Sequence, residues 1–346
     1  MKEPLVTVFI PLYNAESYIH EALESILQQS YMHLQILIID DGSIDRSADI
    51  VRAYIDSRIT FLQNDQNRGI PYTRNRGVRE AKGRYMAVMD ADDMAHPHRI
   101  ERQVAFMEHH PDIDALGSYY EIVGGKITKT LKPKAIKPEE IRARLLFLNQ
   151  ISNPTAFIRL ATLRRHRIRY NSAYFVAQDY DLWVQLSKVG RLSILPEVLM
   201  KYRTGHANVT RQSKSAKVTR RKQVNDAIHH DILDFYQFDL TDDELHVFND
   251  FFNDNYVRDL SDQTVMKLPD VLNKMIIHNK RQQIFDGTLF KEAVKSAVLT
   301  VLNRRKLSLQ QKFYVYRRIC NDGKMRTWAK DLSYMVPKHL YNVLWI

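Results

Sequence analysis

Cysteine is nearly absent from this chain, and long apolar runs are missing. Cys320 is the single cysteine among 346 residues, so no intramolecular disulfide can form. A lone cysteine fits a reducing cytoplasm. No stretch of ~18 apolar residues occurs, so we expect no transmembrane helix. The apolar run near the N-terminus is short and is broken by Pro11, which argues against a signal peptide. We therefore expect a cytoplasmic protein.

Length and charge set wide bounds on the architecture and the partners. A chain of 346 residues fits one large domain with an appendage, or two domains. The 51 Lys and Arg residues exceed the 40 Asp and Glu residues, which gives a formal net charge of +11. This excess suits a nucleotide phosphate, a nucleic acid or an anionic membrane, and it does not choose among them. A solvated basic surface without a specific partner is the plain alternative.

The first part of the sequence alternates between strand-like and helix-like segments. Apolar, β-branched runs occur at 5–10, 35–40, 59–62, 84–89 and 113–118. Segments with helical spacing separate them, at 17–29, 43–54, 72–81 and 98–109. This alternation predicts a mostly parallel sheet covered by helices on both faces. Ligands of such sheets bind beyond the carboxyl ends of the strands.

The pattern changes further along the chain. Runs at 119–123 and 126–131 flank a Gly-Gly pair and predict a hairpin, and short strands are expected at 191–195 and 198–202. Helical periodicity then dominates at 217–235, 242–252, 268–279 and 290–303. We therefore expect an α/β domain over residues 1–215. A helical C-terminal domain over residues 216–346 would contact acceptor, membrane or another subunit.

The segment 295–338 combines basic and aromatic residues. It holds eleven Lys or Arg residues against two Asp residues, interleaved with Phe313, Tyr314, Tyr316 and Trp328. A helical surface of this kind can lie on an anionic membrane. A helical bundle with aromatic residues in its core and solvated charges is the alternative.

The strongest chemical signal is an acidic cluster at a strand end. Asp90, Asp92 and Asp93 fall within four residues at the end of an apolar strand. Concentrated negative charge is costly unless a positive group is near it. A divalent cation provides that charge, and oxygen ligands suit Mg²⁺ or Mn²⁺. Such a cation bridges to a diphosphate and neutralises charge as it leaves. A surface turn with Asp93 as a helix cap is the alternative.

Two other acidic pairs and a histidine are candidate functional residues. Asp40 and Asp41 follow a predicted strand and can accept hydrogen bonds from a base or ribose, or cap the next helix. Asp179 and Asp181 lie beside aromatic residues, where a carboxylate can act as a general base or as a helix cap. His206 follows a late strand and can meet phosphate or metal, although a lone histidine is more often structural.

In number and order, these segments resemble those of the family 2 inverting glycosyltransferases, whose catalytic domain adopts the GT-A fold. The resemblance covers about residues 4–211. It is carried by VFIPLYNAESYIHEALESILQQSY, LIIDDGSIDRSADIV, NRGIPYTRNRGVREAKGRYMAVMDADD, QDYDLW and YRTGHANVT.

The resemblance implies a donor site, a metal site and a base. The implied donor site is formed by Pro11, Tyr13 and Glu16 around the nucleotide, Asp41 on the base with Asp40 alongside, Arg74 and Asn75 near the donor, and Asp90 on ribose or sugar. The implied metal site is Asp92, with Asp93 close by and His206 approaching the metal or the diphosphate. The implied general base is Asp179.

The sequence also departs from the family pattern. Gln178 stands where the family commonly has Glu, Tyr72 replaces a small residue, and Thr210 replaces a usual Ser. The Gln-x-x-Arg-Trp segment of processive synthases is missing. The resemblance therefore implies a single-addition, inverting transferase that uses Mn²⁺ or Mg²⁺. The transferred group would be a hexose or N-acetylhexosamine from a nucleotide donor, for which a UDP-sugar is the best candidate. The acceptor would be a glycan or a lipid-linked sugar in bacterial capsule or lipopolysaccharide synthesis. The resemblance also implies peripheral contact with the cytoplasmic face of the inner membrane.

Three other functions remain as alternatives. A sugar-nucleotide nucleotidyltransferase needs a Gly-rich, basic phosphate loop after the first strand, and PLYNAESY has neither Gly nor Lys. A nucleic-acid-binding protein would explain the charge but would leave the acidic clusters unexplained, so we expect no nucleic acid partner. A catalytically inactive sugar-nucleotide binder would keep the same motifs. The oligomeric state stays open.

Overall fold

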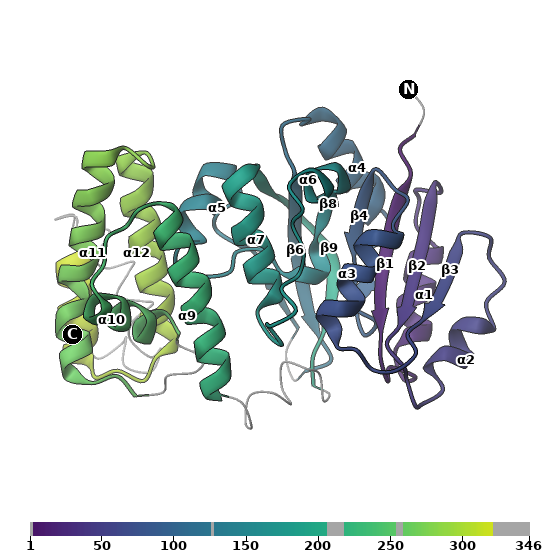
Figure 1. Cartoon of the computed structure of the whole chain (residues 1–346), viewed down its shortest axis with the longest axis horizontal. Helices are drawn as coiled ribbons and strands as arrows, with labels where there is room; N and C mark the ends of the chain where they lie inside the picture. Colours follow the sequence, from purple (N-terminus) through teal and green to yellow (C-terminus); the bar gives the residue numbers. More distant parts are fainter. Residues whose placement is uncertain (1–2, 126–127, 206–217, 254–258, 321–346) are drawn as a thin grey trace, which may run out of the picture. The chain divides into compact units, whose positions relative to one another are not determined.

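The chain divides into two compact units (Figure 1). The computed structural model describes residues 3–125, 128–205, 218–253 and 259–320. Unit 1 comprises Met1–Ile141 and Asn149–Gln212, and unit 2 comprises Arg142–Leu148 and Ser213–Ile346. The boundary expected near residue 215 falls within 206–217, outside the described residues.

Unit 1 is built on a mixed sheet whose strand order is β3-β2-β1-β4-β8-β6-β9-β5, with β7 paired to β6. The parallel half consists of β1 (Val6–Leu12), β2 (Leu34–Asp40), β3 (Ile59–Gln63) and β4 (Tyr85–Val88). These four strands lie side by side in Figure 1. The other half consists of β5 (Met94–Ala95), β6 (Ala115–Val123), β7 (Lys129–Leu131), β8 (Phe157–Arg159) and β9 (Leu192–Arg203). Antiparallel pairs join β8 to β4 and β6, so the parallel pattern of the first half does not continue across the whole sheet.

The parallel half is covered on both faces, as its continuous apolar strands predict. Every residue of β1 and β2 is buried. One face forms a core with α1 (Ile19–Leu27) and α4 (Arg99–His109). The neighbours of Phe9 along β1 belong to that core, so the side chain of Phe9 points to the opposite face of the sheet. There its ring contacts α3 (Ile70–Glu80), and a Cβ added at Gly77 would lie 2.6 Å from the ring. Only glycine therefore allows α3 to approach the strand this closely.

Several predicted elements are confirmed, and one pair is corrected. The hairpin expected around the Gly-Gly pair exists as the antiparallel β6–β7 pair. The two strands expected at 191–195 and 198–202 are a single strand, β9. Its ladder with β6 shifts register between Ser118 and Tyr119, and Pro196 falls at that irregularity. Proline lacks an N–H to donate, and a bulge accommodates it without ending the strand.

The described part of unit 1 contains three further helices. They are α2 (Ser47–Arg52), α6 (Leu160–Arg165) and α7 (Gln178–Val189). Helix α5 (Pro138–Arg144) begins in unit 1 and ends in unit 2. The segment Arg142–Leu148 then packs within unit 2, where Phe147 contacts the rings of Phe248, Phe252 and Phe290. This segment falls within the predicted α/β domain of residues 1–215, yet it packs with the helical unit.

Unit 2 is helical, as its periodicity predicted. Its further helices are α9 (Val218–Phe235), α10 (Asp242–Phe252), α11 (Asp262–Gln282), α12 (Gly287–Arg304) and α13 (Leu309–Ile319). Helix α11 begins six residues before the predicted start at 268, because Ser261 caps it. Pro269 therefore lies inside the helix and not in its first turn. Proline near a predicted helix start is usually a first-turn residue, which explains the misplaced boundary. No helix in the described ranges is long and apolar enough to cross a membrane.

Candidate active site

Three of the predicted polar clusters follow neighbouring strands at one edge of the sheet. Strands β2, β1 and β4 are adjacent and parallel, and Leu12 at the end of β1 pairs with Asp40 at the end of β2. The loops after these strands therefore emerge at the same edge, where ligands of α/β sheets bind. The loops carry Tyr13, Asp41 and the Asp90–Asp93 turn.

Asp40 and Asp41 are buried and are hydrogen-bonded within the protein. Asp40 accepts a 2.5 Å hydrogen bond from the hydroxyl of Ser43, which fixes the turn after β2. Asp41 accepts hydrogen bonds from the backbone N–H groups of Arg68 and Gly69, at 2.9 and 2.8 Å. Gly69 has φ of 85° and precedes the first residue of α3. The contacts made by Asp41 thus fix the start of α3, and its contact with the nucleotide base stays a prediction.

The loop after β1 is joined to the loop after β2. The carboxylate of Glu16 accepts a hydrogen bond from the backbone N–H of Arg46, and the N–H of Glu16 donates to Asp45. Pro11 is buried within β1, whereas the side chain of Tyr13 is 46% exposed at the strand end. Of the three residues predicted to line the nucleotide here, Tyr13 presents its ring to solvent, while Glu16 links the two loops.

The acidic turn after β4 lies close to the second acidic segment. Asp90 is 29% exposed and forms an ion pair with Arg74, with 3.6 Å between carboxylate oxygen and guanidinium nitrogen. Burial is the largest influence and raises the pKa of Asp90 to about 6; Arg74 lowers it, and the charges of Asp92 and Asp179 raise it. Asp90, Asp92 and Asp179 therefore gather in one place, although Asp179 is remote in sequence.

Asp93 is the last residue of this turn and is fully buried. One carboxylate oxygen accepts a 2.8 Å hydrogen bond from the backbone N–H of Arg203, and the other has no partner. Burial, with the nearby charges of Asp90 and Asp92, raises the pKa of Asp93 well above its usual range. Arg203 also donates to the backbone oxygen of Asp92 at 3.0 Å. These contacts fasten the end of β9 to the acidic turn.

Arg74 connects the acidic turn to the start of α7. Its guanidinium donates a 3.0 Å hydrogen bond to the side-chain oxygen of Gln178 while it pairs with Asp90. The same guanidinium lies 5.3 Å above the ring of Tyr170, in a cation–π contact. Arg74 is predicted from the family resemblance to lie near the donor, and Gln178 departs from the family pattern. Tyr170 was not predicted, because no local pattern marks that residue.

The candidate base is held at the N-terminus of α7. Ala177 adopts a left-handed conformation with φ of 53° and turns the chain into the helix. Asp179 is the second helical residue and is partly exposed, and Asn149 donates a 2.9 Å hydrogen bond to its carboxylate. Asn75, in contrast, uses its side-chain amide on the backbone of Tyr170, donating to its C=O and accepting from its N–H at 2.8 and 2.9 Å. Asn75 thus anchors the segment that leads to α7.

The donor set suits a cation that is shared with a substrate. The described residues contain no group of three or more His, Cys, Asp or Glu side chains that would hold a metal ion alone. His206, the third predicted ligand, lies outside the described residues. Magnesium-type cations are commonly bound by one or two carboxylates plus substrate phosphates. Asp92, which is partly exposed beside Asp90, fits that mode better than the fully buried Asp93.

The sheet topology and the acidic edge define a glycosyltransferase of the GT-A type. The chain belongs to glycosyl transferase family 2, whose family model matches residues 7–180. This result confirms the fold class and the enzyme class that the sequence motifs predicted.

Two curated relatives extend the comparison beyond the family model. An uncharacterized glycosyltransferase of Haemophilus influenzae is 36% identical over 238 residues, covering 64% of this chain and 73% of the relative. The Escherichia coli UDP-Glc:alpha-D-GlcNAc-diphosphoundecaprenol beta-1,3-glucosyltransferase WfaP is 29% identical over 240 residues, covering 68% and 92%.

Two solved structures share the fold at low sequence identity. S. aureus TarS 1–349 in complex with UDP-GlcNAc has a TM-score of 0.60 and 20% identity, and the match covers 95% of this chain and 89% of TarS. The mannosyltransferase PcManGT of Pyrobaculum calidifontis, in complex with GDP-Man and Mn²⁺, has a TM-score of 0.51 and 17% identity, and the match covers 100% and 88%.

Proposed function

We propose that this glycosyltransferase is an inverting, metal-dependent and non-processive enzyme that uses a UDP-sugar. Its acceptor would be a lipid-linked or glycan hydroxyl in bacterial surface-polysaccharide synthesis, such as capsule or lipopolysaccharide. The observation that carries the proposal is the contact of Arg74 with both Asp90 and Gln178, which joins the donor-side turn to the segment of the base. UDP-GlcNAc in TarS and the UDP-Glc donor and diphosphoundecaprenol acceptor of WfaP support the substrate classes.

The donor would lie along the edge formed by the loops after β1, β2 and β4. The exposed ring of Tyr13 offers a stacking surface for the base, and Arg74 and Asp90 flank the sugar end. Asp92 would hold a divalent cation, and Mn²⁺ in the PcManGT complex supports this class of ion. When bound, Mn²⁺ or Mg²⁺ stabilises negative charge on the leaving diphosphate.

Asp179 would act as the general base. The hydrogen bond from Asn149 orients its carboxylate at the start of α7. The acceptor hydroxyl gives its proton to Asp179 as its oxygen attacks the anomeric carbon. The bond between that carbon and the diphosphate oxygen breaks, and the nucleoside diphosphate leaves with the bonding electrons. Attack opposite the leaving group inverts the configuration.

The test compares two variants in the same transfer assay. Purified protein is incubated with UDP-glucose, UDP-N-acetylglucosamine and GDP-mannose, with a diphosphoundecaprenol-linked sugar and with Mn²⁺ or a chelator. Asp179→Asn should lower the turnover number about 10²–10⁴-fold while UDP binding is retained. Asp92→Ala should weaken metal-dependent UDP binding as well as turnover. Asp49→Asn changes an exposed carboxylate of α2 and serves as the control.

Wild-type turnover in both site variants would refute the mechanism. The alternative of an inactive sugar-nucleotide binder predicts UDP binding by the wild-type protein without transfer to any acceptor. The nucleotidyltransferase alternative predicts release of pyrophosphate from a nucleoside triphosphate and a sugar phosphate. Analysis of the anomeric configuration of the product separates inversion from retention.

We also propose a peripheral contact with an anionic membrane on its cytoplasmic face. On α13, Leu309 and Phe313 are 52% and 46% exposed, and Arg317 follows four residues later and is also exposed. Exposed apolar side chains next to a cation suit the interface of an anionic bilayer. The rest of the basic segment, from 321 onward, lies outside the described residues.

A further inference from the structure

Unit 2 contains a pocket that the proposed transfer mechanism does not use. It has a volume of about 450 Å³ and lies between α11 and the loop 238–240, which precedes α10. This volume is within the range of about 300–1,000 Å³ that is typical of small-molecule sites. Every residue that lines the pocket belongs to unit 2, so the pocket is complete without a residue of the catalytic unit.

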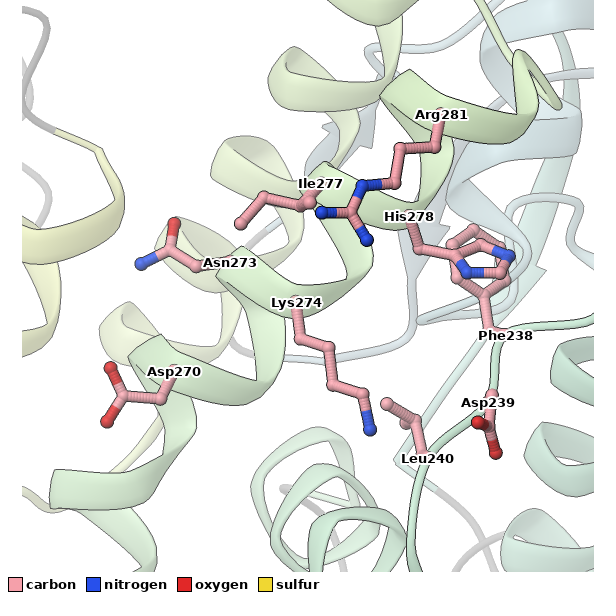
Figure 2. Close-up of a pocket in the computed structure, with 9 residues that line it drawn as sticks. All are labelled: Phe238, Asp239, Leu240, Asp270, Asn273, Lys274, Ile277, His278 and Arg281. Carbon is pink, nitrogen blue, oxygen red and sulfur yellow. The ribbon is translucent and has the colours of Figure 1, made fainter.

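One face of α11 supplies most of the wall. Lys274, Ile277, His278 and Arg281 follow one another at helical spacing and share a face. Figure 2 shows Lys274 and His278 extending from α11 toward Phe238, Asp239 and Leu240. Lys274 is already paired with Glu244, at 2.6 Å between nitrogen and oxygen. Its charge is therefore neutralised at one end of the pocket.

Asp270 is also paired, with Arg318 at 2.7 Å, whereas three other polar groups of the pocket lack protein partners. Among the residues that the structure describes, the side chains of Asp239 and Arg281 make no hydrogen bond or ion pair. The ring of His278 packs on Phe238 with centroids 5.3 Å apart, and its Nε2 atom is buried without a hydrogen-bond partner. Leaving a buried polar atom unpaired costs about 1–3 kcal/mol. A carboxylate, a guanidinium and an imidazole nitrogen are thus available to a ligand.

The balance of charge decides which ligand class fits. Glu244 neutralises Lys274 and Arg318 neutralises Asp270, which leaves Arg281 and Asp239 to contribute one charge of each sign to the lining. A phosphate or nucleotide would meet the carboxylate of Asp239, and a cation would meet the guanidinium of Arg281. A neutral ligand with many hydroxyls can donate to Asp239 and accept from Arg281 without an unpaired charge. Ile277 and Leu240 offer apolar contact for the C–H face of such a ligand.

We propose that this pocket binds a neutral saccharide unit, and that the unit belongs to the acceptor glycan. The second part rests on the proposed function, whereas the first part depends only on the pocket. The site would hold part of a glycan chain on the helical unit while a hydroxyl elsewhere on the chain is the target of transfer. This gives unit 2 a role in choosing the acceptor.

The experiment measures binding of free sugars to the full-length protein without nucleotide or metal. Saturation-transfer NMR and calorimetry are run with glucose, galactose, mannose, N-acetylglucosamine, N-acetylgalactosamine and rhamnose. At least one sugar should bind the wild-type protein. Asp239→Ala and Arg281→Ala should each weaken that binding tenfold or more. Lys280→Ala changes an exposed neighbour that does not line the pocket and should bind like the wild type.

Binding of UDP in the same preparations separates this proposal from the transfer mechanism. Loss of sugar binding in both variants, with UDP binding and thermal stability unchanged, would support a saccharide site in unit 2. Sugar binding that survives both variants would place it elsewhere and overturn the proposal, as would binding of no sugar by the wild type. Competition by inorganic phosphate or pyrophosphate would also overturn it in favour of an anion site. A protein that binds sugar here but transfers none would refute only the proposed function.

Discussion

The clamp between Asn75 and Tyr170 allows a sharp test of how the catalytic edge is built. Asn75 was predicted from the family resemblance to lie near the donor. In the structure its amide instead satisfies both backbone groups of Tyr170, the N–H and the C=O. Asn75→Ala removes both hydrogen bonds at once and changes no charge. A donor contact and a structural clamp therefore predict different outcomes for the same substitution.

The size of the effect follows from the burial of Tyr170. This residue is 1% exposed, so its two backbone groups would lose their partners in a place that water reaches poorly. Each unpaired group costs about 1–3 kcal/mol. Asn75 itself is partly exposed and its removal admits some water, so we expect a loss of about 2–4 kcal/mol. For a unit of this size, each kcal/mol lowers the melting temperature by about 2–4 °C, which gives a fall of roughly 4–16 °C.

The assay is thermal denaturation of the full-length protein, followed by calorimetric titration with UDP. Arg79→Ala changes an exposed residue of the same helix and is the control. The clamp predicts a lower melting temperature for Asn75→Ala and, at a temperature where the variant is folded, UDP affinity near that of the wild type. An unchanged melting temperature with UDP affinity reduced more than tenfold would refute the clamp and support a direct donor contact.

Two further predictions concern unit 2. Burial lowers the pKa of His229 below its usual value, against the raising effect of its hydrogen bond with Asn249, so protonation favours the unfolded chain. The stabilising contribution of neutral His229 is present above about pH 6.5 and is lost as the pH falls toward the folded pKa, by up to about 1.4 kcal/mol per pH unit. His229→Gln should therefore flatten the pH dependence of the melting temperature, whereas the exposed control His230→Gln should not. Equal slopes in the wild type and both variants would contradict this. Replacing Leu309 and Phe313 together by Ser should reduce co-sedimentation with anionic phosphatidylglycerol vesicles at least threefold, and unchanged sedimentation would exclude α13 as the contact.

The elements of the fold were predictable where periodicity was strong. The buried strands β1 and β2 are continuous apolar runs, and the helices of unit 2 carry long apolar stripes with few breakers. Boundaries failed where proline was ambiguous, at Pro196 within β9 and at Pro269 within α11. In both cases tertiary pairing or an upstream cap determined the outcome, and neither is visible in a short window of sequence.

The residue types of the candidate site were predictable from the sequence, but the contacts between them were not. Acidic residues at strand ends were recognisable because parallel strands deliver their carboxyl ends to one edge. The contact between Arg74 and Gln178 spans 104 residues, and the one between Asn75 and Tyr170 spans 95. Contacts of this range depend on how α3 packs against the segment before α7, and a single sequence carries no periodic trace of that packing.

The acidic clusters looked alike in the sequence, yet their surroundings divide them into two kinds. Asp40 and Asp41 are buried but accept hydrogen bonds from hydroxyl, amide and backbone donors, including those of Gln63 and Asn64. Such donors compensate each charge within the protein, so these two residues need no external partner to be stable.

The second kind is concentrated at the turn after β4. The charges of Asp92 and Asp179 raise the pKa of Asp90, and Arg74 pairs with Asp90 at 3.6 Å. Folding therefore brings like charges close together here, and a strand end and a helix start hold the carboxylates in place. Stored repulsion of this kind is relieved by a bound cation. The repulsion between these carboxylates, and not the number of acidic residues, distinguishes the turn that we propose binds metal and diphosphate from the residues that fix the neighbouring loops.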